Sequence, residues 1–227
     1  MRPPDRLACG WALVVLIGVV INLLVLVVTP LLRPDLNLLE KSLSYYAVGP
    51  WGALQAVAFI ALGISSVALG VALRGASLPS RWEWPIVLLL VISGVAGLGL
   101  VWYPMDAPGP ATILGDAHQT VGTVGGVAQL AAALAFTIAI RADPAWGRLF
   151  STALAMFSLA VLGAILSQVA IWWPHLDIPM GATMRLLVVP LTILWGLVAL
   201  RLRRTCAGTL NQSAGGTSPR RYSFRPD

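Results

Sequence analysis

The sequence predicts an all-α integral membrane protein that crosses the membrane six times. Of its 227 residues, 58% are hydrophobic and 11% are charged, whereas soluble domains are about half apolar and about a quarter charged. The hydrophobic residues form six long stretches, each close to the ~20 residues that a helix needs to cross a bilayer. Transmembrane β-strands alternate in polarity and run for only about ten residues, so a barrel is excluded. The composition also excludes a soluble enzyme, a disordered chain and a disulfide-rich secreted module.

Each predicted span is a continuous apolar run. The first follows Arg2 and Arg6 as a signal peptide would, but it is too long and lacks a small-residue cleavage site, so we expect it to be retained. Asp116 is expected to be the N-cap of the fourth, and the sixth contains Arg185, the one charge inside a span. Residues 205–227 read as a disordered basic tail after a transmembrane domain of residues 1–204. The spans are expected at residues 7–32, 48–73, 85–103, 117–140, 149–173 and 182–200.

The distribution of basic residues predicts that both termini are cytoplasmic. The N-terminus, the second and fourth loops and the C-terminal tail hold twelve arginines, against three Arg or Lys residues in the other loops and their flanks; such residues favour the cytoplasmic side. Cys9 and Cys206 then face a reducing compartment, so no disulfide is expected. The net charge of +6 predicts attraction to anionic lipids rather than to nucleic acid. Arginine greatly outnumbers lysine, as in GC-rich bacterial genomes, which suggests a bacterial plasma membrane.

Polar residues collect towards the predicted external ends of the spans, which predicts an external polar vestibule. Polar groups are costly in lipid and normally face a bundle interior or a wet cavity. Arg185 is a candidate for holding a lipid phosphate or a carboxylate; the favoured alternative is an ion pair with Asp106, Asp116 or Asp177. Candidate ligand-binding residues of this region are Arg185, Gln55 and Gln168.

Two kinds of chemistry can be considered for the same residues. A catalytic zinc site needs three protein ligands and an open position. The candidate zinc ligands in this region are His118, His175, Asp116 and Asp177. The alternative to a metal is that these are ordinary loop residues. A serine nucleophile is the other case, since a histidine could activate Ser42 or Ser44, although no Gly-x-Ser-x-Gly motif is present. Phosphate-binding and dinucleotide-binding glycine motifs are also absent, because Gly94, Gly97 and Gly99 lie within a span.

Four short motifs in order resemble a known family. They are Leu43-Ser44 leading to Gly49, Tyr103-Pro104-Met105-Asp106, His118 at the start of the fourth span, and Arg185 in the sixth. Together they are similar to the bacterial six-span membrane proteins of domain-of-unknown-function family 998. The resemblance implies a six-helix fold without an established activity, and makes Ser44, Asp106, His118 and Arg185 candidates for a shared site. Met184 stands where the family pattern leads us to expect an acidic neighbour of the arginine.

Three functional hypotheses follow. The first is an accessory protein that binds a lipid or partner through its external face. The second is a metal-dependent hydrolase or transferase acting on lipid-linked substrates, with zinc or a similar divalent ion as cofactor. The third, a small transporter, rests on the similarity between residues 102–112 and 173–183, which suggests a repeated hairpin. Small residues at helical spacing, such as Gly63 and Gly70 or Gly122 and Gly126, predict close helix packing and allow a homodimer.

Overall fold

Six long helices form the protein, and the predicted fold class is confirmed. The computed structural model describes residues 6–75, 78, 80–106 and 111–215, and these contain no strand. All six long helices are apolar and long enough to cross a membrane. They are α1 (Arg6–Leu32), α2 (Gly52–Arg74), α3 (Ser80–Gly99), α4 (Ile113–Ile140), α5 (Phe150–Trp172) and α6 (Met180–Gly215), joined in part by three 3-10 helices, η1 (Leu43–Ala47), η2 (Gly147–Leu149) and η3 (Pro174–Leu176).

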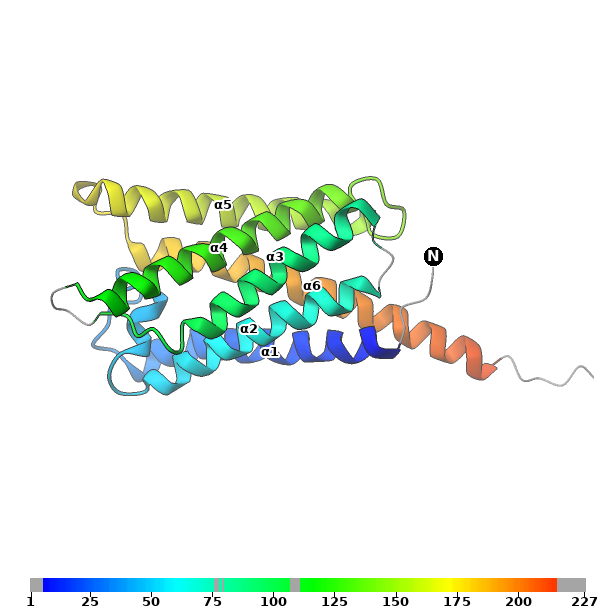
Figure 1. The fold of residues 1–227 in the computed structure, drawn as a ribbon, viewed down its shortest axis with the longest axis horizontal. Coiled ribbons are helices and arrows are strands. Elements are labelled where there is room, and N and C mark those ends of the chain that lie inside the picture. The colour runs from blue at the N-terminus through cyan, green and yellow to red at the C-terminus, as the bar shows by residue number, and fades with distance from the viewer. Residues whose placement is uncertain (1–5, 76–77, 79, 107–110, 216–227) are drawn as a thin grey trace, which may run out of the picture.

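The helices run alternately up and down, and neighbours in sequence pack side by side (Figure 1). Helix α6 closes the bundle by packing against α1 as well as α5, whereas α5 touches α4 only lightly. Because the number of spans is even, the beginning of α1 and the end of α6 lie at the same end of the molecule. We call this end the Cys9 end and the opposite one the His118 end.

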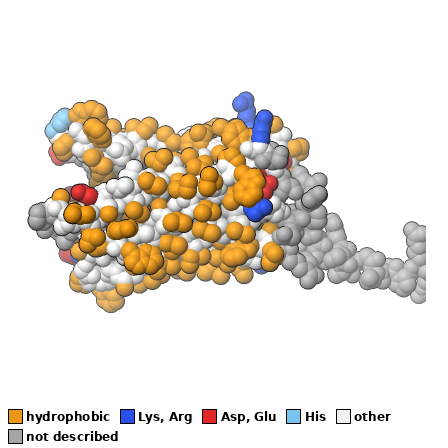
Figure 2. Space-filling view, in the orientation of Figure 1, with side chains coloured by type: hydrophobic (Ala, Val, Ile, Leu, Met, Phe, Trp, Pro, Cys, Tyr) orange, Lys and Arg blue, Asp and Glu red, His pale blue; other side chains and the backbone are white. Residues whose placement is uncertain are grey.

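The outer surface of the bundle matches a membrane environment. Figure 2 shows hydrophobic side chains over the length of the helices, with charged side chains gathered near the two ends. Inside, the Cys9 end holds an aromatic core in which the Phe136 ring meets the edges of Trp146 and Trp195 at centroid distances of 5.8 and 5.7 Å. Edge-to-face contacts of this kind add to the burial of the rings themselves.

Helix α6 is longer than predicted, and the expectation of disorder from residue 205 is wrong for residues 205–215. The helix continues to Gly215 because Leu202 and Cys206, one turn apart on one face, are both buried. The chain beyond residue 215 lies outside the described residues. At the start of α2 the deviation is opposite: Gly49 and Trp51 have positive φ angles of 80° and 67°, which end the preceding turn, so α2 begins at Gly52.

Close helix packing occurs at some of the predicted glycines. A Cβ atom at Gly63 would lie 2.7 Å from the Gly94 carbonyl oxygen, so α2 and α3 cross at nearly backbone contact. Gly163 of α5 is equally restricted by the backbone of α6. Gly126 has open space instead, so the predicted packing role is wrong for that residue.

Candidate functional site

The start of α4 is built by the loop before it. Thr112 is the N-cap, and its side chain accepts a hydrogen bond from the Gly115 amide at 3.1 Å. The Asp106 carboxylate in turn accepts hydrogen bonds from the Thr112 amide at 2.9 Å and hydroxyl at 2.6 Å. These contacts start α4 at Ile113, four residues before the predicted start, so the expectation that Asp116 is the N-cap is wrong.

The earlier start of α4 places His118 inside the bundle, where it joins two other segments. Its side chain is 3% exposed. Ring atom Nδ1 lies 2.6 Å from the Tyr103 carbonyl oxygen, and Nε2 lies 2.8 Å from the Ser44 hydroxyl. A carbonyl oxygen can only accept, so Nδ1 must carry the hydrogen; in the neutral ring, Nε2 then accepts from the Ser44 hydroxyl. Residues predicted separately as candidates, Ser44 and His118, are thus in direct contact.

The surroundings of this contact are apolar on one side and polar on the other. The Phe59 ring of α2 meets the His118 ring edge-on at 6.3 Å. One turn earlier on α2, Gln55 is 2% exposed, and its side-chain oxygen has no hydrogen-bond partner among the residues described. Ser44, in contrast, is partly exposed. The histidine is therefore shielded from solvent, whereas Ser44 keeps part of its surface exposed.

Asp106 contributes a negative charge near His118. The pKa of Asp106 is lowered from its ordinary value, mainly by the hydrogen bond from the Thr112 hydroxyl, next by that from the Thr112 amide, with a smaller electrostatic contribution from His118. The structure therefore groups three of the predicted candidates, Ser44, Asp106 and His118, around one point. It adds the Tyr103 carbonyl and Thr112, which sequence reasoning did not identify because main-chain acceptors and caps leave no recognisable side-chain motif.

The lowered pKa of Asp106 predicts a pH dependence of stability. A carboxyl group whose pKa is lower in the folded protein stabilises it above the unfolded value, ~3.9 for Asp, and this contribution is lost as the pH falls through the lowered pKa. We expect Asp106→Asn to remove part of the loss of stability seen on acidification below about pH 4. Unfolding midpoints of the wild type and the variant from pH 3 to 7 measure this, with Asp177→Asn, at an exposed carboxylate, as the control. Parallel curves for wild type and Asp106→Asn would contradict the assignment.

Arg185 connects α6 to the first loop. Its Nη1 atom donates to the carbonyl oxygens of Leu38 at 2.7 Å, Gly181 at 2.9 Å and Lys41 at 3.4 Å. The amides of Gly181 and Ala182 bind carbonyls of the same loop. Among the described residues, no carboxylate lies within ion-pair distance of Arg185, so the favoured ion pair with Asp106, Asp116 or Asp177 is wrong. The Arg185 side chain binds backbone carbonyls instead of a carboxylate, because the first loop lies against the start of α6.

One edge of the Arg185 guanidinium has no hydrogen bond to the part of the chain that the structure describes. Atoms Nε and Nη2 on this edge are buried. These two nitrogens are the side of the guanidinium that binds carboxylate or phosphate oxygens in a bidentate manner. The Tyr46 ring lies 5.6 Å from the centre of the group.

Residues 16–201 match the family model described as "Protein of unknown function (DUF998)". The chain belongs to the DUF998 family. No curated protein and no solved structure matches it. The resemblance drawn from the four motifs is therefore confirmed at the level of the family, and three of those motifs meet at the Ser44–His118 contact of this DUF998 protein.

The other candidate residues of the DUF998 protein lie apart from this contact. His175 is exposed in η3, Asp177 follows it with a φ of 47°, and Asp116 is exposed in the first turn of α4. Gln168 is exposed on α5, where its neighbour Ser167 instead donates to the Thr183 hydroxyl at 2.9 Å. Within the described part of the chain, no three His, Cys, Asp or Glu side chains are grouped as metal ligands. The zinc site stays a prediction.

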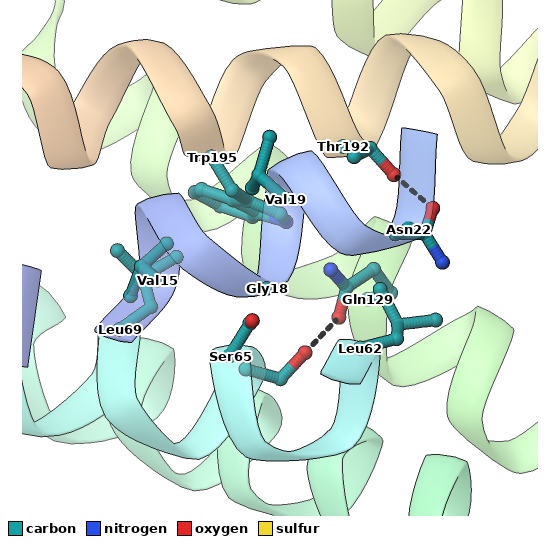
Figure 3. Close-up of a pocket in the computed structure, with 11 residues that line it drawn as sticks. Val15, Gly18, Val19, Asn22, Leu62, Ser65, Leu69, Gln129, Thr192 and Trp195 are labelled. Atoms are coloured by element: carbon teal, nitrogen blue, oxygen red, sulfur yellow. Dashed lines mark hydrogen bonds between the residues drawn. The ribbon is translucent and has the colours of Figure 1, made fainter. Parts of the chain in front are cut away.

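A second polar group lies in the middle of the bundle, and sequence reasoning missed it. The Gln129 side-chain oxygen accepts from Ser93 at 2.5 Å and from Ser66 at 3.5 Å, and the Thr192 hydroxyl lies 3.5 Å from the Asn22 side-chain oxygen. Between them is a cavity with about 10 Å³ open to the centre of a water molecule (Figure 3), which is enough for about one water. The signal that could have located it is Gln129, an amide side chain at mid-span of the fourth helix.

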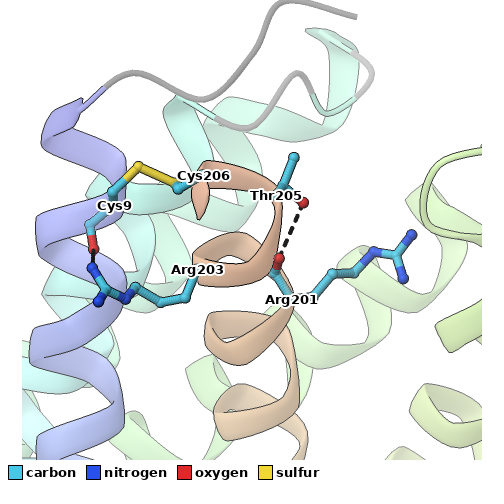
Figure 4. Close-up of a disulfide and its surroundings, with 5 residues drawn as sticks. All are labelled: Cys9, Arg201, Arg203, Thr205 and Cys206. Carbon is cyan, nitrogen blue, oxygen red and sulfur yellow. Dashed lines mark hydrogen bonds between the residues drawn. A yellow bond between two sulfur atoms is a disulfide. The ribbon is translucent and has the colours of Figure 1, made fainter. Parts of the chain in front are cut away.

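A disulfide joins α1 and α6 at the Cys9 end, and the expectation that both cysteines stay reduced is wrong for this structure. Cys9 and Cys206 are bonded, with their Cα atoms 6.1 Å apart (Figure 4). Arg203 also donates to the Cys9 carbonyl at 3.4 Å. The expectation considered only the compartment. Helix α6 in fact continues to Gly215, about four turns beyond the predicted end of the span at residue 200, and this extension brings Cys206 beside α1.

Proposed function

We propose that this DUF998 protein resides in a bacterial plasma membrane with its Cys9 end in the cytoplasm. The support is the twelve-to-three distribution of arginine and lysine. The disulfide at the Cys9 end argues the other way, because cytoplasmic thiols are normally kept reduced. The charge distribution carries more weight, because it determines the orientation while the helices insert into the membrane. Two cysteines that lie so near each other can be either bonded or reduced, according to the compartment.

We further propose that the His118 end binds the anionic headgroup of a membrane lipid. The observation that carries this is the edge of Arg185 on which Nε and Nη2 are buried and form no hydrogen bond with any described residue. A buried guanidinium without a counter-ion is unfavourable, and a buried polar group without a partner normally indicates a water or ion that completes it. A phosphate or carboxylate would supply both the charge and the two acceptors.

The position of Arg185 agrees with a lipid ligand. It lies five residues into α6, about 7.5 Å from the helix end at 1.5 Å per residue, which is near the level of lipid headgroups. Lys41 of the covering loop adds a second positive charge, and its ammonium lies 5.3 Å from the Tyr45 ring. An open groove lined by Arg201 and Arg204 lies at the opposite end of α6 and serves as a comparison site.

The test is lipid binding by Arg185→Gln. Two charge-assisted hydrogen bonds contribute roughly 1.5–3 kcal/mol each, so we expect at least about a hundredfold loss of affinity for phosphatidylglycerol. Native mass spectrometry and thermal stabilisation by phosphatidylglycerol, compared with phosphatidylcholine and with inorganic phosphate, measure it. Stabilisation by inorganic phosphate alone would indicate a free anion instead of a lipid.

Arg33→Gln and Arg204→Gln are the two matched controls. Arg33→Gln removes a cation at the same end that is already paired with Asp35 at 2.8 Å, and Arg204→Gln removes one at the opposite end of α6. Both should retain binding. Equal binding by wild type and Arg185→Gln, or loss only in Arg204→Gln, would refute the proposed site. If Arg185→Gln does not fold, Arg185→Lys keeps the charge but not the planar edge, and it is expected to show the same loss.

The remaining hypotheses stay predictions. A zinc ion on His118 would have to displace either the Ser44 or the Tyr103 contact, since both ring nitrogens are occupied. The homodimer, the partner membrane protein and the transporter built on a repeated hairpin are not specifically supported by any contact among the described residues.

A further inference from the structure

We infer that Ser44 is a nucleophile activated by His118, and that the protein hydrolyses or transfers acyl groups of lipid esters at the His118 end. This activity does not rest on the Arg185 proposal, because it draws on different residues and a different observation. That observation is the chain of contacts from the Ser44 hydroxyl to His118 Nε2 at 2.8 Å, and from Nδ1 to the Tyr103 carbonyl at 2.6 Å.

The direction of these hydrogen bonds is the one that general-base catalysis requires. The Tyr103 carbonyl fixes the proton on Nδ1, so the Nε2 lone pair faces the serine hydroxyl. A serine is a weak nucleophile unless a base within hydrogen-bond distance takes its proton and a third group orients that base. Ser44, His118 and the Tyr103 carbonyl occupy these three roles, although they come from η1, α4 and the loop that follows α3.

Charge and burial support the same assignment. Proton transfer to His118 would create an imidazolium, and the Asp106 carboxylate, which already interacts electrostatically with that ring, would stabilise it. Asp106 does not contact the ring through a hydrogen bond, so its role is that of a positioning and charge-stabilising residue. The 3% exposure of His118 shields the base from water, which strengthens these interactions.

The location indicates the substrate class. Trp51 and Trp102, 56% and 72% exposed, lie at this same end, and exposed tryptophans favour the membrane interface. The ester linkages of glycerolipids lie at this depth, just below the headgroups. Ser44 is partly exposed here, so an acyl ester of a membrane lipid is the reactive group placed nearest to it.

The reaction balances without a further cofactor. The Ser44 oxygen attacks the ester carbonyl carbon, His118 Nε2 takes the hydroxyl proton, and the carbon–oxygen bond to the alcohol breaks. The alcohol leaves with the proton from His118, and the acyl group remains on Ser44 as an ester. Water, or the hydroxyl of a second lipid, then attacks this ester with its proton passing through His118, which releases a fatty acid or a new ester and restores Ser44.

The test is covalent labelling of the detergent-solubilised full chain by a fluorophosphonate probe. Attack of Ser44 on phosphorus expels fluoride and leaves a stable adduct, whose site is mapped by mass spectrometry. We expect the adduct on Ser44 in the wild type, none in Ser44→Ala, and labelling at least about 100-fold slower in His118→Gln, since general-base catalysis contributes 10²–10⁴-fold. Ser42→Ala is the matched control, because Ser42 is two residues away and its hydroxyl donates to the Met105 sulfur at 3.9 Å rather than to a histidine.

The outcomes separate catalysis from a purely structural hydrogen bond. A structural role predicts no adduct on Ser44 in the folded wild type, or equal labelling in His118→Gln, and either result overturns the inference. Loss of labelling on treatment with a chelator would overturn it in favour of metal chemistry. Mapping on the wild type needs no variant to fold, and fatty-acid release from phosphatidylglycerol vesicles by the wild type but not Ser44→Ala gives the second measurement. Lipid retention is a separate readout, so failure here leaves the Arg185 proposal to its own test.

Discussion

Substitution of Gly163 by alanine is expected to detach α5 from the bundle and to lower the stability of the protein markedly. A Cβ atom there would lie 2.5 Å from the Leu187 amide nitrogen and 2.8 Å from the Thr183 carbonyl oxygen. These are backbone atoms of α6, which cannot rotate away. Overpacking of this kind costs about 1–3 kcal/mol or more, and the separated helices would also lose the Ser167–Thr183 hydrogen bond one turn away. Helix α5 has little other contact to hold it, since it touches α4 only lightly.

Gly126→Ala is the matched control for this prediction. Nothing lies within 4 Å of a Cβ atom at Gly126, and alanine favours a helix over glycine by up to about 1 kcal/mol. The control should therefore be neutral or slightly stabilising. Unfolding in a sodium dodecyl sulfate titration, followed by circular dichroism, compares the two variants. A Gly163→Ala protein as stable as Gly126→Ala would show that α5 does not pack on α6 as described.

Loss of the Cys9–Cys206 bond is expected to free the last turns of α6 from α1. The bond joins residues 197 apart, and closing so long a loop would contribute up to about 5 kcal/mol in a soluble chain. The contribution here should be smaller, ~1–2 kcal/mol, because helices inserted in a membrane are already constrained in the unfolded state. Cys206→Ser should thus lower the unfolding midpoint moderately, and reduction of the wild type should reproduce the effect.

The same cysteines test the proposed orientation. Thiols in intact cells are trapped by acid, then modified with a maleimide–polyethylene glycol before and after reduction. If the Cys9 end is cytoplasmic, we expect the Cys9–Cys206 bond to be reduced in the cell and to form on exposure to air after lysis. A bond already formed in intact cells would place this end in an oxidising compartment and contradict the orientation inferred from arginine.

The spans were predictable from sequence because burial in lipid acts on each segment separately. Any helix that crosses the bilayer must satisfy its own backbone and expose apolar side chains, so α1 and α5 can be located within one residue without knowledge of their neighbours. The deviations arise where tertiary contacts decide. Thr112 and Asp106 start α4 early, and the burial of Leu202 and Cys206 extends α6.

The site was predictable only as a set of residue types. Ser44, Asp106, His118 and Arg185 could be chosen because polar residues in a membrane protein are costly and normally have a purpose. The hydrogen-bond partners of these four residues could not be predicted. Ser44 and His118 are 74 residues apart, and the groups that orient His118 and occupy Arg185 are main-chain carbonyls, which every residue possesses.

The sequence by itself therefore determined the class of protein, its six membrane-spanning helices and its family, because these depend on composition and on motifs read along the chain. Only the tertiary structure decided which polar groups meet. It paired Ser44 with His118, left one edge of Arg185 without a partner, and joined Cys9 to Cys206. The physical reason is that hydrophobicity is a property of each segment alone, whereas a hydrogen bond or a disulfide requires two groups to come within a few ångströms, which the packing of the helices determines.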